Sequence, residues 1–263
     1  PDRAYAVGAI LQAIVAAAMS VILSSLIIPK FGPTGMFFSL AAVVLLGGVV
    51  CFWMPESRMV DSRATASVTG VKGISQLGML VRPMIAMLAM ALFTGGIVGF
   101  WYFAERIGAS RGVSVDFIGL ALGVCALTSM AASGAIVVLA GKFSSMAFVV
   151  VGTLITLSGY ALLAVPGDGA YFVSILLFGA GWGGAQPAYW AVLRRVDATG
   201  RIFVAAPAAS GVSAVAIGLV AGPVIEAGGY SGLVMFSGGL LTAGAAAVAL
   251  SNRMGEGRLL AGG

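Results

Sequence analysis

The sequence predicts an all-α membrane protein that crosses the bilayer about eight times. Hydrophobic residues make up 60% of its 263 residues and charged residues only 9%, whereas water-soluble domains carry roughly 25% charged residues. The mean hydropathy is +1.09. The apolar residues form repeated stretches near the ~20 residues that a helix needs to cross a bilayer core about 30 Å thick. Glycine accounts for 39 residues, and such small residues let helices pack closely in lipid.

Eight apolar windows, separated by polar breaks, define the expected spans. They cover residues 4–29, 35–53, 82–104, 116–140, 146–165, 170–193, 202–226 and 231–251. The breaks combine helix-stopping glycine or proline with polar residues, as at residues 29–33, 54–58, 141–143, 166–169 and 228–230. The longest break, about residues 54–81, mixes charges with Ser, Thr, Ala and Gly, which is typical of a solvated linker. It divides the chain into two spans followed by six.

The distribution of basic residues predicts the orientation of these spans. An even number of spans places both ends of the chain on one side of the membrane. Only three of the 14 Lys and Arg residues then fall on the other side: Lys30, Arg106 and Arg111. Because cytoplasmic loops are enriched in basic residues, we expect a multi-pass protein of the plasma membrane, the inner membrane in a bacterium, with both termini in the cytoplasm.

Several short motifs accompany this two-plus-six pattern. They are Pro55-Glu56-Ser57 after the second span, the loops Gly141-Lys142 and Asp197-Ala198-Thr199-Gly200-Arg201, and Gly218-x-x-x-Gly222-Pro223 in the seventh span. With these features the chain resembles, over essentially its whole length, the major facilitator superfamily, whose members have two six-helix bundles joined by a long cytoplasmic loop. The resemblance implies that residues 1–57 are the last two spans of an N-terminal bundle, that residues 58–81 are the cytoplasmic linker, and that residues 82–263 are the C-terminal bundle with a short cytoplasmic tail. It also implies that about four further spans precede residue 1.

The resemblance assigns gating or structural roles to five residues. These are Lys142, Arg201, Gly218, Gly222 and Pro223. In relatives the loop arginine caps helix ends or pairs with acids, and the Gly-Pro element belongs to the related fifth span of antiporters. The chain departs from the pattern in two ways: residues 143–145 lack the acid and the further basic residues of the family loop, and the first span lacks Gly-Pro. Membrane anchoring by the two basic residues, and close packing or bending at the Gly-Pro element, are the alternatives.

The segment that most resembles a binding site lies in the span at residues 170–193. Its glycines and Pro187 are expected to loosen the helix around Trp182, Gln186 and Tyr189. Trp182 and Gln186 are four residues apart and share a helix face, which offers a ligand an aromatic ring and an amide; Tyr189 extends that face. The alternatives are a hydrogen bond from Gln186 to a neighbouring helix and a place for Tyr189 in the aromatic belt at the membrane interface.

A second group of candidates lies at the end of the span at residues 82–104. Trp101 and Tyr102 lie toward the outer mouth, after glycines that are expected to make the helix flexible, and Trp101 shares a face with Glu105. Glu105 is the candidate for proton coupling, because a carboxylate buried in the membrane can take up and release a proton. An interface carboxylate beside Arg106 is the alternative. No span centre carries an acidic residue, a basic residue or histidine.

These observations favour a secondary active transporter. We expect it to move a small organic solute, neutral or amphipathic, by alternating access, with H⁺ as the coupling ion and another ion as the alternative. A non-transporting receptor or channel-like protein of the same architecture is the alternative function. We expect a monomer. We also expect no enzymatic activity, because the chain has no histidine and no expected span contains a pair of acids. Cys51 and Cys125 lie alone in apolar runs, so we expect no metal or cofactor. The basic residues are too scattered to indicate nucleic-acid binding.

Overall fold

The computed structural model describes residues 76–197 and 200–260, together with isolated positions between residues 7 and 45. Apart from those isolated positions, the expected spans at residues 4–29 and 35–53 and the linker up to residue 75 lie outside the described residues. Residues from Ser75 onward belong to one compact unit.

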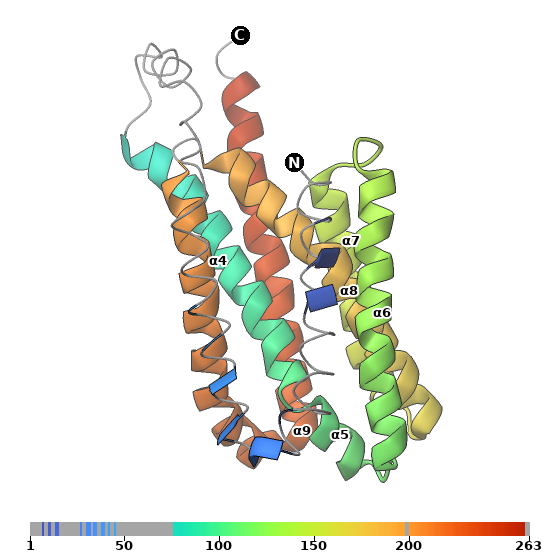
Figure 1. Ribbon diagram of the computed structural model, residues 1–263. Helices are drawn as coiled ribbons and strands as arrows, with labels where there is room; N and C mark the ends of the chain where they lie inside the picture. The colour runs from blue at the N-terminus through green and yellow to red at the C-terminus, as the bar shows by residue number, and fades with distance from the viewer. Residues whose placement is uncertain are drawn as a thin grey trace. The chain divides into compact units, whose positions relative to one another are not determined.

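Helices fill the described part of this unit (Figure 1). They are α4 (Gln76–Trp101), α5 (Ala104–Ser110), α6 (Val115–Leu139), α7 (Ser145–Leu162), α8 (Asp168–Val196) and α9 (Arg201–Leu260). One isolated backbone bridge joins Ala140 to Phe143, and residues 76–197 and 200–260 contain no strand. The all-α prediction is therefore confirmed for these ranges. α4 begins at Gln76, inside the segment expected to be linker.

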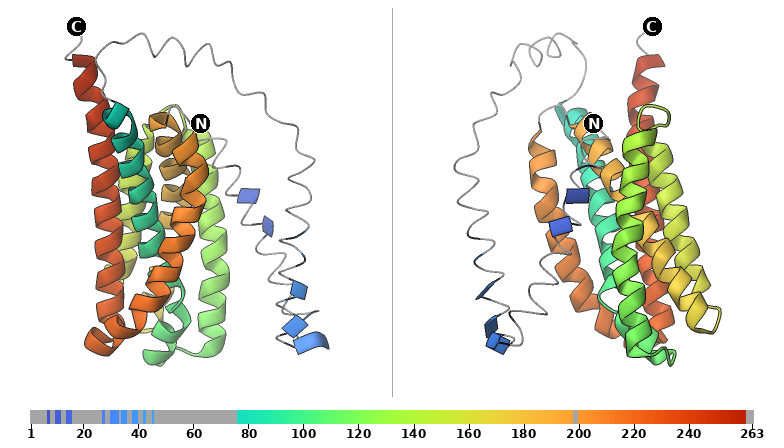
Figure 2. Two further views of the ribbon diagram at one scale, coloured as in Figure 1. Left: turned by 90° about the vertical axis from the view of Figure 1, so that its left-hand side faces the viewer. Right: turned by 45° about the vertical axis from the view of Figure 1, so that its right-hand side comes forward.

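α9 consists of two helices joined at a bend. Gly229 has φ 63° and ψ −165°, a conformation that is essentially restricted to glycine. The bend falls within the expected break at residues 228–230. The first arm (residues 201–228, orange) and the second arm (residues 230–260, red) run in opposite directions (Figures 1 and 2). The two arms occupy the positions at which the sequence predicts two separate spans.

Four helical stretches within the described residues are long and apolar enough to cross a membrane. They are Val81–Ser110, Val115–Leu139, Ser145–Leu162 and Arg201–Met254, and the last includes both arms of α9. The chain is therefore compatible with a membrane protein. α8 has 29 residues, but it is less apolar than these four stretches.

Charged side chains lie toward the two ends of the described bundle. The turn between α6 and α7, the junction of α8 and α9 and the end of α9 lie at one end (Figure 1). This basic end carries the exposed residues Lys142, Arg194, Arg195, Arg201 and Arg253. The opposite end carries the exposed acids Glu105, Asp116, Asp168 and Glu226. Apolar helix surfaces between two charged ends match the profile of a bilayer.

α8 lies between α6 and α7, and its glycines set the distance to both. A Cβ on Gly179 would lie 2.5 Å from a carbonyl oxygen of α6, and a Cβ on Gly183 would overlap the α6 backbone. A Cβ on Gly181 would lie 2.6 Å from a carbonyl oxygen of α7. α8 remains helical from Asp168 to Val196. The glycines therefore permit close packing on both sides, and they do not loosen the helix as the sequence led us to expect.

Pro187 is accommodated within α8 by a hydrogen bond from α6. A proline has no backbone N–H, so the carbonyl group four residues earlier, that of Gly183, loses its helical donor. The hydroxyl of Ser133 on α6 donates to this carbonyl oxygen across 2.9 Å. Ser133 is buried, so the bond lies inside the bundle. α6 thus completes the hydrogen bonding of α8 at the position where proline interrupts it.

α4 packs against both arms of α9 through its own glycines. A Cβ on Gly95 would lie 2.8 Å from the hydroxyl oxygen of Ser213 in the first arm, and a Cβ on Gly96 would lie 2.7 Å from the carbonyl oxygen of Ser237 in the second. Ser213 also donates to the carbonyl oxygen of Ala91 on α4 across 2.7 Å. The glycines that were expected to make this helix flexible instead hold it close to α9.

Candidate functional site

Five aromatic rings from three helices form one cluster, which we call the aromatic cluster. Its members are Phe100 and Trp101 on α4, Tyr160 on α7, and Phe178 and Trp182 on α8. The ring centroid of Phe178 lies 4.8 Å from that of Phe100, 5.9 Å from those of Trp101 and Trp182, and 6.3 Å from that of Tyr160. These separations are typical of favourable aromatic pairs. The cluster joins Trp101 to Trp182, two candidates from separate spans, at 6.0 Å.

Burial decreases from one side of the aromatic cluster to the other. Phe100 and Phe178 are fully buried. Tyr160 is also buried, and its hydroxyl donates to the carbonyl oxygen of Gly96 across 2.9 Å. Trp101 and Trp182 are only half-buried. The two tryptophans therefore have exposed aromatic surface, and both pack against the buried ring of Phe178.

Gln186 lies one helical turn beyond Trp182 and shares its face of α8. It is half-buried, and its side-chain amide forms no hydrogen bond with any described residue. The expected alternative, a bond to a neighbouring helix, is therefore not formed within the described ranges. An amide without such a bond keeps both its donor and its acceptor groups for another partner. Trp101, Trp182 and Gln186, which we call the Trp–Gln face, thus combine aromatic surface with hydrogen-bonding groups that a ligand can use.

Tyr189 is covered and adds no accessible surface to this face. Its ring stacks on Phe93 of α4, with centroids 4.4 Å apart and planes inclined by 25°, and only 1% of the residue is exposed. The hydroxyl of Thr153 on α7 lies near that of Tyr189. The sequence led us to expect that Tyr189 extends the face of Trp182 and Gln186, whereas the structure covers its ring with Phe93.

The helix that carries Trp101 is interrupted immediately after it. α4 ends at Trp101 and α5 begins at Ala104, because Phe103 has φ −117° and ψ 3°, outside the helical range. The four-residue spacing of Trp101 and Glu105 therefore does not place them on one face of a continuous helix. Tyr102 is 55% exposed, and Glu105 is exposed in the first turn of α5.

The five gating or structural candidates are all exposed. Lys142 lies in the turn between α6 and α7, and Arg201 is the first residue of α9. Gly218, Gly222 and Pro223 lie in the first arm of α9, which remains helical past the proline. A Cβ on either glycine would meet no atom of the described residues within 4 Å. The two glycines therefore make no close contact with any described helix.

Asp197 has a structural role that the sequence reasoning did not assign. The residue is 1% exposed, and its Oδ2 accepts a hydrogen bond from the backbone N–H of Phe203 across 2.7 Å. Phe203 lies in the first turn of α9, where backbone N–H groups have no helical acceptor. The signal in the sequence is the preference of Asp for positions just before a helix.

No protein-family model matches the chain, and no curated protein matches its sequence. The functional interpretation therefore depends on the fold and on the Trp–Gln face.

Proposed function

We propose that the protein is a secondary active transporter that moves a small organic solute by alternating access, and that the Trp–Gln face forms part of its solute site. The observation that carries this proposal is the amide of Gln186, which has no hydrogen-bond partner among the described residues and lies one helical turn from the half-buried Trp182, whose ring centroid is 6.0 Å from that of Trp101. In the proposed site, Trp101 and Trp182 stack on the apolar part of the solute. Gln186 then exchanges hydrogen bonds with its polar part.

The composition of α8 supports this placement. α8 is less apolar than the four stretches that are long and apolar enough to cross a membrane, and many of its residues are buried. A helix of this kind is stable in a membrane when protein or a water-filled cavity covers its polar positions. Transporters bind their solutes near the bilayer midplane, between bundles of such helices. Gln186 lies far from both ends of α8, which agrees with such a site.

The chemistry of the Trp–Gln face indicates a neutral or amphipathic solute. An indole ring binds apolar and aromatic groups, and an amide both donates and accepts hydrogen bonds without carrying charge. We propose H⁺ as the coupling ion. Glu105, the candidate for exchanging it, is exposed in the first turn of α5, so it would take up H⁺ at the end of the bundle and not at the Trp–Gln face. We place the basic end in the cytoplasm and the protein in the plasma membrane, following the positive-inside rule.

Transport by the full-length protein tests the proposal directly. The protein is reconstituted in liposomes that contain a pH-sensitive dye, and sugars, amino acids, organic acids and aromatic amines are added in turn. We expect one class to produce a pH change that Gln186→Ala and Trp182→Phe reduce by at least tenfold. Trp190→Phe is the matched control, because Trp190 is a half-buried residue of the same helix that packs against Phe203, outside the aromatic cluster.

Two outcomes would count against the proposal. If no solute class produces a pH change or accumulates as radiolabel, the protein is not a transporter of these solutes. If transport occurs but Gln186→Ala and Trp182→Phe behave like Trp190→Phe, the solute binds elsewhere. Size-exclusion chromatography of every variant separates loss of transport from loss of folding.

A further inference from the structure

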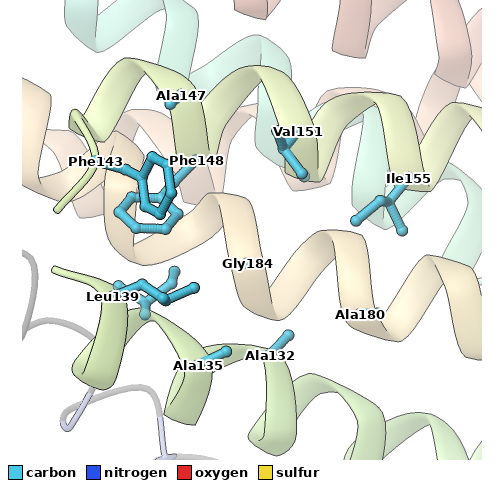
Figure 3. A pocket seen from close by; sticks show the side chains of 12 residues that line it. Ala132, Ala135, Leu139, Phe143, Ala147, Phe148, Val151, Ile155, Ala180 and Gly184 are labelled. Carbon is cyan, nitrogen blue, oxygen red and sulfur yellow. The ribbon is translucent and has the colours of Figure 1, made fainter.

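An apolar groove runs along the bundle between α6 and α7, with α8 as its floor (Figure 3). Its volume is about 330 Å³, and all the residues that line it are apolar or glycine. The side chains of Ala135 on α6 and Val151 on α7 lie on its opposite walls, above Ala180 and Gly184 of α8. The groove is separate from the Trp–Gln face, whose residues do not line it.

The shape of the groove follows from small residues on its floor. A Cβ on Gly184 would meet no described atom within 4 Å, so open space lies directly above the backbone of α8. Along α7 the lining extends from Ala147 to Ile155, which is about 12 Å of helix. This length is close to the thickness of one leaflet, about half of the ~30 Å hydrocarbon core.

One end of the groove lies next to the turn that carries Lys142. Phe143 lines the groove, and the preceding residue, Lys142, is exposed in the turn between α6 and α7. Lys142 is the only charged residue among residues 139–145. Arg194 and Arg195 are also exposed at this basic end. Hydrocarbon would therefore lie inside the groove while an anionic group reaches its basic mouth.

We propose that this groove binds one acyl chain of an anionic phospholipid, with the phosphate held by Lys142. Both walls belong to helices that are long and apolar enough to cross a membrane, so lipid is the solvent that surrounds them. A linear hydrocarbon chain fits this space, and a basic residue at the membrane surface favours anionic headgroups. The proposal does not depend on the transport function.

Photo-crosslinking of lipid to the full-length protein tests the proposal. The probe is phosphatidylglycerol with a diazirine in one acyl chain, diluted into phosphatidylcholine vesicles that contain the protein; cross-linked peptides are then identified by mass spectrometry. We expect labelling to concentrate on the groove, at Val151 and Ile155. Gly184→Leu should reduce this labelling at least fivefold by filling the groove. Lys142→Gln should reduce labelling by the phosphatidylglycerol probe about fivefold, but not labelling by the equivalent phosphatidylcholine probe.

Gly123→Leu is the matched control. Gly123 is exposed on α6 and has open space above it, like Gly184, but it does not line the groove. If Gly184→Leu fails to fold, Ala135→Leu fills the groove from α6 instead. Labelling that is spread evenly over α6 and α7, and that neither filling variant reduces, would overturn the proposal in favour of an ordinary lipid annulus. Cross-links between two copies of the chain across the groove would also overturn it, because a second copy would then be the occupant.

Discussion

Ser133 on α6 supplies the hydrogen bond that Pro187 on α8 cannot make. The two residues act on one group, the carbonyl of Gly183, which lies four residues before the proline and receives the Ser133 hydroxyl across 2.9 Å. A proline within a membrane helix is tolerated when a neighbouring helix satisfies the freed carbonyl group. The relationship predicts that the two residues are energetically coupled.

We expect Ser133→Ala to lower the free energy of unfolding by about 0.6–1.7 kcal/mol, the range for hydrogen bonds between membrane helices. When Pro187 is replaced by Ala, Ser133→Ala should lower the free energy of unfolding much less, because the introduced alanine has a backbone N–H that donates to the Gly183 carbonyl. A double-mutant cycle of unfolding in mixed micelles measures the coupling. Ser158→Ala is the control, since Ser158 is exposed and donates within its own helix. If Ser133→Ala lowers the free energy of unfolding equally with and without Pro187, the two residues are not coupled.

Gly181→Ala should separate α8 from α7. The added Cβ would lie 2.6 Å from the carbonyl oxygen of Gly152 and 2.7 Å from the backbone nitrogen of Thr156. Backbone atoms cannot move aside as a flexible side chain can, so we expect a loss of about 1–3 kcal/mol. Gly184→Ala is the matched control, because it lies one turn away and has open space above it. Thermal denaturation in detergent compares the two; a control that loses as much stability as Gly181→Ala would rule out this explanation.

Asp197→Ala should destabilise the junction between α8 and α9. The substitution leaves the N–H of Phe203 without the carboxylate oxygen that now lies 2.7 Å away, and loss of a cap at a helix start costs about 0.5–2 kcal/mol. Hydrogen exchange of the first turn of α9 should therefore become faster. The comparison variant is Asp168→Ala, since Asp168 is an exposed acid in the first turn of α8 and should change exchange in α9 very little.

Arg111→Lys should loosen the opposite end of the bundle despite keeping the charge. The guanidinium donates from Nη1 to the carbonyl oxygen of Leu163 and from Nη2 to that of Val165, so it holds the turn between α7 and α8. Lysine cannot bridge two carbonyl groups in this planar geometry. We expect limited proteolysis at residues 163–168 to become faster. Arg106→Lys is the control, and equal protection of the turn in Arg111→Lys would show that the paired hydrogen bonds do not stabilise it.

Hydropathy and break residues predicted most of the described architecture. The expected spans at residues 116–140 and 146–165 correspond to α6 at Val115–Leu139 and α7 at Ser145–Leu162. The bend at Gly229 lies where Gly228, Gly229 and Tyr230 predicted a break. These features depend on local composition, which a sequence shows directly. The two spans expected before residue 54 lie outside the described ranges, so the total of about eight spans remains a prediction.

Features that depend on a neighbouring helix could not be predicted in this way. The glycines of α8 suggested a loosened helix, but the roles of Gly179, Gly181 and Gly183 are set by the backbones of α6 and α7 beside them. The face shared by Trp182 and Gln186 followed from helical spacing. The covering of Tyr189 by Phe93 could not be predicted from helical spacing, because it depends on contact between α4 and α8. The interruption of the helix at Phe103 could not be predicted either, because no glycine or proline lies among residues 100–107.

The low apolarity of α8 has a consequence for how the protein enters the membrane. Insertion of a single helix depends on the apolarity of that helix alone, and α8 is less favourable in this respect than α6, α7 or α9. Its glycine-lined faces become stable in lipid only when α6 and α7 cover them. We therefore expect α6 and α7, which both precede α8 in the chain, to be in place before α8 enters the membrane. A substitution that prevents α7 from docking is therefore expected to lower the amount of protein recovered from membranes, and not only the activity of the protein that is recovered.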